Sequence, residues 1–350
     1  MESNIRFIFN PEHDLCLASG DVNFIPPAAA VRFAQEGKWI ERFMRAPGGV
    51  QPGGGNAAGK IVPWGWNAVL KRKLMEEGWP LEVLPSDEEL DFIRENSRRE
   101  LAVELLERLQ GAGVECLPAP ATPATILPHT YRTIAHTLEE IESFLHQHRR
   151  VVLKAPLSGS GKGIRFVTGE LMETDRGWCR KTLQKQGAVI VERRMEIGQE
   201  FAMLFECTPA AERPYGNVAF RGYSMFYASN GAYKGNILAS NEYIENTLSQ
   251  WVPKGMLHKV QEKIARLLQE KLQGKYTGFI GVDQFICPHN GAMLYNPAME
   301  INLRMTMGLI ARNIYDYHKE EYTLGEGTHC FEPERGIILL PCSGLPQTLL

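Results

Sequence analysis

The sequence predicts an α/β protein of two or three domains or subdomains. Three observations carry this prediction. The chain of 350 residues is too long for one small core. Short β-branched apolar runs and stretches of helical periodicity both recur along it. Its apolar fraction of 44% and charged fraction of 23% are those of an ordinary globular protein, which excludes a disordered chain.

Charge, hydropathy and cysteine content exclude several other classes of protein. A formal net charge of -3 gives no basic field that would attract a nucleic-acid backbone. No apolar run approaches the roughly 18 residues of a membrane span, and the run at 5–9 is too short for a signal peptide. The seven cysteines are scattered and include no Cys-x-x-Cys pair, which favours reduced thiols. We therefore expect a cytoplasmic protein that binds neither nucleic acid nor membrane.

The N-terminal region begins with a strand and continues through loops. Residues 5–9 (IRFIF) read as a buried strand, and residues 10–27 (NPEHDLCLASGDVNFIPP) read as a polar loop that contains proline. Residues 46–60 are so rich in Gly and Pro that they form either a mobile loop or a binding loop. Residues 81–85 (LEVLP) look like another short strand.

Four polar residues crowd the end of the first strand, namely Asn10, Glu12, His13 and Asp14. Ligands of α/β folds tend to bind at the carboxyl ends of strands, so these residues are candidates for substrate contact. A turn with solvated charges has at least equal weight.

Two capping patterns predict the next helices. Ser97 with Glu100 matches a capping box, and leucines then recur at helical spacing through Leu109. A helix should therefore start at about residue 97, with a domain boundary just before it. Thr137 with Glu140 repeats the pattern and predicts a second helix that ends near residue 149.

The second half of the chain reads as strands around one long helix. Residues 188–206 contain two strands separated by a turn. Apolar residues at helical spacing predict a helix over 254–273, with Gly274 at its end. In the stretch 278–308, Asn290-Gly291 is a strong turn signal between two strands of a hairpin.

The stretch VVLKAPLSGSGKGIRFV at 151–167 is the first sign of chemistry. A Walker A loop would need Gly where Pro156 stands and a hydroxyl where Gly163 stands. A dinucleotide fingerprint would need Gly at Ile164 and a helix after it, whereas GIRFV reads as a strand. What remains is a strand, Lys154, a flexible glycine loop and a second strand. Such a loop can close over a triphosphate with its backbone N–H groups, or it can be an ordinary hairpin turn.

The stretch EINLR at 300–304 is the second sign. On a strand, Glu300, Asn302 and Arg304 share one face, which would suit Mg²⁺ together with phosphate. Asp283 lies on the partner strand of the hairpin, and two acids that face each other repel unless a cation lies between them. The alternative is a solvated sheet face with alternating charge.

In this order, these motifs resemble the ATP-grasp superfamily from about residue 96 to about residue 312. The resemblance implies two α+β subdomains that clasp ATP, preceded by a Rossmann-like N-terminal domain. The implied domains are 1–95, a lid subdomain at 96–191, a C-terminal subdomain with the metal site at 192–325, and a tail at 326–350.

The resemblance also implies a role for each motif residue. Lys154 would touch the phosphates, and Glu200 would bind the ribose. Lys234 and Arg304 would act on the phosphates and on the transferred phosphoryl group, with Arg221 as a rival for the role of Lys234. The closing loop would consist of Ser158, Gly159, Ser160, Gly161, Lys162 and Gly163. The hinge that binds adenine would consist of Glu192, Arg193, Arg194 and Met195. The metal ligands would be Asp283, Glu300 and Asn302.

The implied cofactors are ATP and one or two Mg²⁺ ions, with Mn²⁺ as a substitute. The implied activity is that of a ligase, which phosphorylates a carboxylate so that an amine can attack it. A small-molecule kinase and a regulatory protein that only binds ATP are the alternatives. The substrates would be a small carboxylate and an amine, such as an amino acid or peptide, and a homodimer is left open. The 17 positions between Asp283 and Glu300 exceed the usual spacing, and Pro297 should bulge the strand between them.

Overall fold

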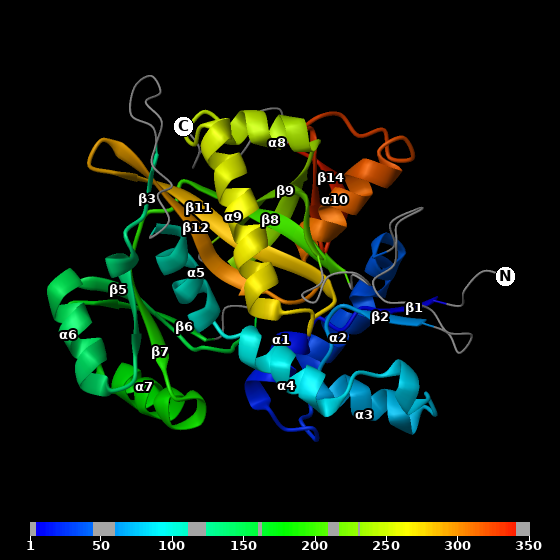
Figure 1. Ribbon diagram of the computed structural model, residues 1–350, viewed down its shortest axis with the longest axis horizontal. Coiled ribbons are helices and arrows are strands. Elements are labelled where there is room, and N and C mark those ends of the chain that lie inside the picture. The colour runs from blue at the N-terminus through cyan, green and yellow to red at the C-terminus, as the bar shows by residue number, and fades with distance from the viewer. Residues whose placement is uncertain are drawn as a thin grey trace.

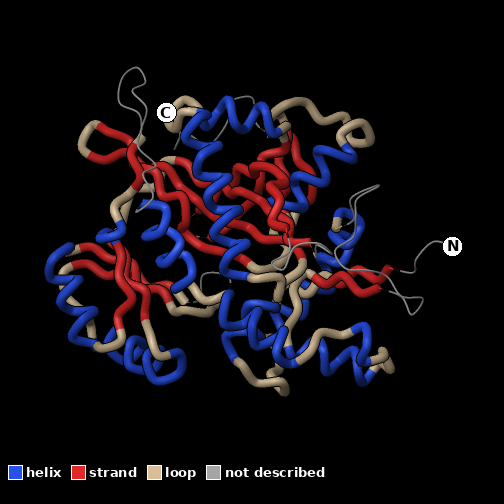
Figure 2. The backbone as a smooth tube through the Cα atoms, in the orientation of Figure 1, coloured by secondary structure: helices blue, strands red, loops and turns tan. Residues whose placement is uncertain are grey.

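The computed structural model describes residues 5–44, 60–110, 124–159, 163–208, 217–229 and 232–340. Within these ranges the strands form sheets of two, four and eight strands, drawn in red in Figure 2. The four-stranded and eight-stranded sheets each carry their own helices, as Figure 1 shows. The prediction of a mixed α/β chain with two α+β subdomains is therefore confirmed. No helix in the described ranges is long and apolar enough to cross a membrane.

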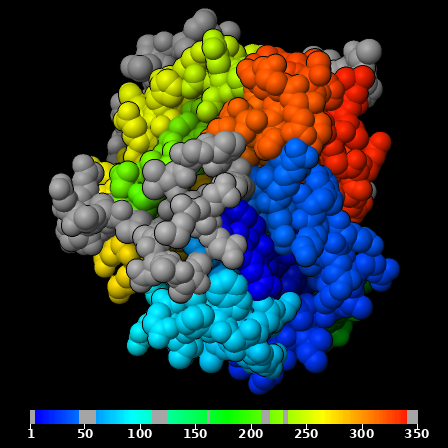
Figure 3. All heavy atoms as spheres, turned by 90° about the vertical axis from the view of Figure 1, so that its right-hand side faces the viewer, coloured from blue at the N-terminus to red at the C-terminus, as the bar shows by residue number. Residues whose placement is uncertain are grey.

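The N-terminal domain is built on two parallel strands, β1 (Ile5–Ile8) and β2 (Lys60–Pro63). Its helices are α1 (His13–Ser19), α2 (Ala28–Glu36), η1 (Gly37–Phe43), α3 (Ala68–Glu76), η2 (Leu81–Val83) and α4 (Asp87–Asn96). In Figure 3 this domain, in blue and cyan, lies directly against the C-terminal segment in orange and red. An apolar core shared by η1 and α10 joins the two regions.

Two local predictions in this domain were wrong. The expected loop at 10–27 contains α1, whose buried residues His13, Cys16 and Leu17 recur at i, i+3 and i+4 within a mainly polar segment. The expected strand at 81–85 is the 3₁₀ turn η2, because the prolines at 80 and 85 leave too few residues between them for strand pairing.

The helix start expected at Ser97 also lies elsewhere. Ser97 follows α4, and its hydroxyl donates a hydrogen bond to the carbonyl oxygen of Ile93 at 2.7 Å. The capping box belongs to α4, where Ser86 and Glu89 bond each other's backbone N–H groups. The next helix, α5 (Glu100–Gln110), begins three residues after Ser97. Both Ser residues fit the sequence pattern, and only the structure distinguishes them.

The four-stranded sheet has the order β4-β7-β5-β6 and lies in the region expected to be the lid subdomain. Its strands are β4 (Arg132–Ala135), β5 (Arg150–Lys154), β6 (Ile164–Thr168) and β7 (Val189–Arg193). Its helices are α6 (Leu138–His148) and α7 (Glu173–Gln186), which pack on one face through a small apolar core. The predicted cap of α6 is confirmed, because the Thr137 hydroxyl accepts a hydrogen bond from the Glu140 N–H at 3.2 Å.

The eight-stranded sheet has the order β14-β13-β10-β9-β8-β11-β12-β3. Its strands are β3 (Thr125–Ile126), β8 (Gln199–Thr208), β9 (Asn217–Ser229), β10 (Ala232–Leu238), β11 (Gly278–His289), β12 (Ala292–Asn302), β13 (His329–Glu332) and β14 (Gly336–Leu339). One face packs on α5, α8 (Asn241–Leu248) and the predicted long helix α9 (Lys254–Leu272). Part of the opposite face of this sheet packs against α10 (Met307–His318). The rest of that face lies beside the N-terminal domain.

Two of the implied domain limits differ from the way the elements pack. The helix α5, expected in the lid subdomain, contributes Leu101, Leu105 and Leu106 to the core of the large sheet. The expected tail at 326–350 contains β13 and β14, which extend that sheet by antiparallel pairing next to β10. The apolar face of α5 could pack against either subdomain. The sequence of the helix therefore does not determine which sheet it packs against.

The predicted hairpin of β11 and β12 is confirmed. Asn290 and Gly291 have φ values of 51° and 76°, which is the left-handed backbone that a tight two-residue hairpin turn requires. The pairing places Asp283 opposite Glu300 and then shifts, so that Phe285 lies opposite Asn296. The extra residues of β12 lie around Pro297, as the sequence predicted, because proline cannot donate to the strand ladder.

Two glycine-to-alanine substitutions distinguish the effect of backbone strain on stability from the effect of side-chain packing. A Cβ at Gly291 or at Gly177, in the middle of α7, would meet no atom within 4 Å. Gly291→Ala should lower the free energy of unfolding by about 1 kcal/mol because its φ is positive, whereas Gly177→Ala should raise it by about 1 kcal/mol. Urea unfolding measures both changes, and equal effects of the two substitutions would contradict the assigned turn.

Candidate functional site

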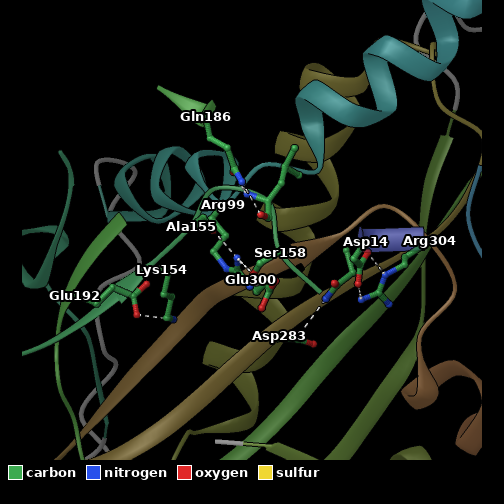
Figure 4. Close-up of polar contacts among 12 residues, drawn as sticks. Asp14, Arg99, Lys154, Ala155, Ser158, Gln186, Glu192, Asp283, Glu300 and Arg304 are labelled. Carbon is green, nitrogen blue, oxygen red and sulfur yellow. Dashed lines mark hydrogen bonds and ion pairs between the residues drawn. The ribbon is translucent and has the colours of Figure 1, made fainter. Parts of the chain in front are cut away.

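Four segments that are far apart in the sequence meet around one small cavity of about 20 Å³. Figure 4 shows their side chains converging from the N-terminal domain, the start of α5, the glycine loop and the end of β12. The polar residues that line the cavity are His13, Asp14, Ser97, Arg99, Ser158, Glu300, Asn302 and Arg304. The cavity thus brings together residues that the sequence assigned to the loop, to the metal and to the N-terminal substrate region.

Asp283 and Glu300 form the acidic part of the site. They are directly paired on neighbouring antiparallel strands, which places both side chains on the same face of the sheet. Burial, together with the Glu300 charge, raises the pKa of Asp283 from 3.8 to about 7. A carboxyl group that is buried beside another carboxylate gains a favourable environment when a cation lies between them.

Asn302 lies on the same face as Glu300 and donates a hydrogen bond to the Asp283 carboxylate at 3.0 Å. Two carboxylates and one amide oxygen are hard ligands, and they fit Mg²⁺ or Mn²⁺ in chemical type. Among the described residues no group of three or more His, Cys, Asp or Glu side chains could hold a metal ion. The candidate metal site therefore depends on the amide oxygen of Asn302, on water or on a bound phosphate for its remaining ligands.

The base of the glycine loop is fixed to its surroundings. The Ala155 N–H donates to the Gly163 carbonyl at 2.8 Å, and Gln186 bonds both the N–H and the carbonyl of Leu157 at 2.7 and 3.0 Å. Gly159 packs so closely on Leu15 that an added Cβ would lie 2.8 Å from that side chain. The first part of the expected closing loop is therefore anchored against both α7 and α1. Ser160, Gly161 and Lys162 lie outside the described residues.

Arg99 is a central residue of the site that sequence reasoning missed. One of its terminal nitrogens donates to the Ala155 carbonyl at 2.6 Å and to the Ser158 hydroxyl at 2.8 Å. The other donates to Glu300 at 2.9 Å (Figure 4). The Arg99 N–H also bonds the Pro156 carbonyl at 3.0 Å. Arg99 follows a helix end in a segment, ENSRREL, that is otherwise rich in charge, so no spacing in the sequence distinguishes it.

Lys154 ends β5 and forms an ion pair with Glu192 of β7 at 2.6 Å, with both side chains nearly buried. Burial raises the pKa of Glu200 while the nearby Lys154 charge lowers it, so the two residues lie in one electrostatic environment. The lysine is thus held at the junction of the two sheets, next to the residues expected to bind adenine and ribose.

The rest of the expected adenine hinge crosses from the lid to the large sheet. Arg193 is the last residue of β7, and the Arg194 guanidinium lies 5.0 Å from the centre of the Phe166 ring. Met195 packs against the core of the large sheet. The position between the two sheets is compatible with the expected role, which remains a prediction.

Two other basic residues are less well placed than the sequence suggested. Lys234 is exposed on β10, where the pairing with β9 shifts between Tyr233 and Gly235. Arg221 is also exposed and forms an ion pair with the buried Glu206. Neither lines the cavity, so the choice between them for the second phosphate-binding role stays open.

Arg304 makes a two-pronged ion pair with Asp14, both contacts being 2.8 Å, and also donates to the Met305 carbonyl. The fork of this guanidinium is therefore occupied by the N-terminal domain (Figure 4). The Asp14 charge raises the pKa of Arg304 against the effect of burial, and the Arg304 charge lowers that of Asp14.

The polar residues after β1 divide into two groups. Asn10 donates to the Gly65 carbonyl at 2.9 Å, and His13 packs so closely on Gly65 that an added Cβ would lie 2.6 Å from its ring. Both residues are buried and hold the loop after β2. Asp14 instead faces the end of β12 through Arg304, and His13 also lines the cavity. The segment is therefore partly structural and partly a wall of the site.

No family model matches the chain, and no curated protein matches it. Several solved structures do. N5-carboxyaminoimidazole synthetase from Staphylococcus aureus, complexed with ADP, is 12% identical, with 92% of this chain and 74% of that chain covered and a TM-score of 0.43. D-alanyl-alanine synthetase A from Vibrio cholerae is 13% identical, with 88% and 91% covered and a TM-score of 0.43.

A third solved structure, N5-carboxyaminoimidazole ribonucleotide synthetase from Thermus thermophilus, is 15% identical, with 92% and 79% covered and a TM-score of 0.41. Identities this low, with TM-scores below 0.5, assign neither an activity nor a substrate to the chain.

The Asp14–Arg304 pair should stabilise the docking of the N-terminal domain. Asp14→Asn leaves a largely buried guanidinium without its counter-charge, so we expect a loss of about 3 kcal/mol in the free energy of unfolding. The exposed pair Arg42–Glu321 also joins the two regions and provides a control. Glu321→Gln should change stability by less than about 1 kcal/mol in the same denaturant titration. Equal losses in the two variants would contradict a special role for Asp14.

His13 should make stability depend on pH. Burial lowers its pKa from 6.5 to about 4, so its contribution is fully present above about pH 6.5 and is lost as the pH falls through 4. Denaturant unfolding of the wild type and of His13→Gln at several pH values measures this contribution as a difference. The wild type should lose on the order of 3 kcal/mol more than the variant between pH 7 and pH 4. Parallel pH profiles would show that the ring is not buried in its neutral form.

Proposed function

We propose that this protein is an ATP- and Mg²⁺-dependent ligase that activates a carboxylate as an acyl phosphate for attack by an amine. One observation carries the proposal. The paired acids Asp283 and Glu300 lie beside the anchored glycine loop, and Arg99 contacts both Glu300 and that loop. Hard oxygen ligands for a metal and donors for phosphate thus share one cavity.

Each group has a task that its surroundings support. Lys154 sits at the end of a fixed strand, where it can neutralise phosphate charge, and the N–H groups of the glycine loop can bind phosphate oxygens. Asp283, Glu300 and Asn302 would hold Mg²⁺, which supplies charge neutralisation for phosphoryl transfer. Arg99 can add a second positive charge beside the transferred group.

The site contains no persuasive nucleophile or general base within the described residues, and the proposed chemistry needs none. Phosphoryl transfer depends mainly on positioning and on the neutralisation of charge, both of which these residues can provide. The ion pair between Asp14 and Arg304 closes the side of the cavity that faces the N-terminal domain.

The proposal is tested by the products formed with Mg·ATP and panels of small carboxylates and amines. A ligase should release ADP and phosphate only when both a carboxylate and an amine are present, and it should form an amide. A stable phosphorylated product without an amine would indicate a kinase instead. Nucleotide binding without turnover on any panel would favour a regulatory protein.

Glu300→Gln should abolish this turnover, with at least about a 100-fold loss, because the neutral amide weakens the metal site and leaves Arg99 without its partner. The assay is ADP release under Mg·ATP, and a thermal melt shows that the variant is folded. Glu270→Gln, on the exposed surface of α9, is the matched control and should retain full turnover. Normal turnover in Glu300→Gln would remove this residue from the metal site.

A further inference from the structure

The two edges of the eight-stranded sheet differ in their protection against further pairing. At one edge, β3 has only two residues and is followed closely by Pro128, and short strands and prolines both hinder the addition of another strand. At the other edge, β14 has the sequence Gly-Ile-Ile-Leu, which contains no charge and no proline. Among the described strands only β13 pairs with β14, and their register is regular. Within the described ranges, this second edge is therefore available to another strand.

The backbone of β14 turns two of its residues outward. The Leu340 N–H donates to the Thr328 carbonyl at 2.8 Å, and Ile338 follows in the same phase of the ladder with β13. Hydrogen-bonded and non-hydrogen-bonded pairs alternate along antiparallel strands, so Ile337 and Leu339 direct their N–H and C=O groups away from β13. Such a row of outward donors and acceptors is what another strand needs for pairing.

A hollow of about 340 Å³ lies beside this edge. Its lining residues are Trp39, Phe43, Tyr322, His329, Ile337 and Leu339. Leu339 is 68% exposed and Trp39 is 40% exposed, although both side chains are large and apolar. Figure 3 shows the C-terminal segment, in red, at the surface beside the N-terminal domain in blue. The hollow and the exposed side chains thus form an apolar surface next to the edge strand.

The outward backbone groups and the hollow belong to the same two residues. Ile338 packs against the core under α5 and α9, whereas Ile337 packs against the core that joins the N-terminal domain to the sheet. Side chains alternate along a strand, so Ile337 and Leu339 share the face that lines the hollow. A further strand paired with β14 would therefore place every second side chain beside this hollow.

A second copy of β14 meets both requirements. When two copies pair antiparallel about a two-fold axis at Ile338, Ile337 of each copy lies opposite Leu339 of the other. Each of these pairs can exchange both of its backbone hydrogen bonds, which uses all the outward groups of the two residues. Opposed side chains share a face, so the exposed Leu339 of each copy lies beside the hollow of the other. The strand is thus complementary to itself in backbone and in side chains.

We propose that two copies of this chain associate through β14, which joins their large sheets into one continuous sheet. The second copy would also cover Trp39 of η1, whose ring packs on Phe331 of β13 with the ring centres 5.8 Å apart. None of the residues that line the hollow lines the cavity with the paired acids, so the association does not depend on the proposed activity. A contact made of backbone hydrogen bonds and apolar side chains should not weaken at high salt.

The experiment uses the full chain. Sedimentation velocity over a range of protein concentrations, at low and at high salt, should show a dimer that persists at high salt. Hydrogen exchange followed by NMR then locates the contact. The N–H groups of Ile337 and Leu339 should exchange slowly only where the chain is dimeric, whereas the Ile338 N–H, which faces β13, should be protected at every concentration.

Substitutions at Leu339 test the edge without removing a hydrogen bond to β13. Leu339→Pro removes only an outward N–H, and Leu339→Lys adds a charge of the kind that protects natural edge strands. Each should raise the dimer dissociation constant by about 100-fold or more, because a symmetric interface loses the contact twice. Leu81→Lys is the matched control, since Leu81 is 59% exposed on η2, and it should leave the constant unchanged. A thermal melt shows that each variant is folded.

A chain that stays monomeric at every concentration would overturn the proposal. A dimer that both Leu339 substitutions leave intact would also overturn it, because that dimer would use another surface. Protection of Ile337 and Leu339 that does not depend on concentration would show that the edge is already paired within one chain. Dissociation of the dimer by salt would show a charged contact in place of an apolar one, and either of these last results rejects the proposed interface.

Discussion

The site depends on one electrostatic constraint, which is that Asp283 and Glu300 lie side by side on the same face of the large sheet. The register of the β11–β12 hairpin imposes this arrangement, and the left-handed turn at Asn290 and Gly291 fixes that register at one end. Two partly buried carboxylates repel each other unless protonation, an arginine or a cation compensates. The first two are seen here, because the pKa of Asp283 is raised and Glu300 pairs with Arg99. The arrangement therefore favours any cation that can replace them.

Arg99 connects the glycine loop to the acidic pair through hydrogen bonds. Arg99 bonds the loop at Ala155 and Ser158 and bonds the sheet at Glu300, so one guanidinium joins the base of the glycine loop to the candidate metal site. Gln186 holds the loop from the opposite side, at Leu157. The base of the loop is therefore held from two sides. A change of charge at Glu300 would therefore alter the hydrogen bonds that Arg99 makes to the loop.

Local patterns were sufficient for much of the fold. The hairpin turn at Asn290-Gly291, the bulge at Pro297 and the cap at Thr137 each follow from the chemistry of one or two residues. The errors arose where two patterns competed. Polar residues concealed the buried stripe of α1, and the Ser97 pattern was equalled by a true capping box at Ser86. Arg99 could not be found from sequence at all, because its partners come from the lid loop and from β12, 56 and 201 positions away.

The two arginines of the site show why type and spacing alone cannot assign a role. Arg304 has the expected position, at the end of EINLR, yet its fork is filled by Asp14 and its neighbour Met305 bonds the Trp64 carbonyl. Its main effect in this structure is to hold the N-terminal domain against the sheet. Arg99 has no recognisable motif, yet it keeps an unused donor in the cavity. The hydrogen-bond capacity that each guanidinium still has available is thus a better guide to ligand binding than its place in a motif. By that criterion the available donor belongs to Arg99, whereas Arg304 holds the N-terminal domain against the sheet through Asp14.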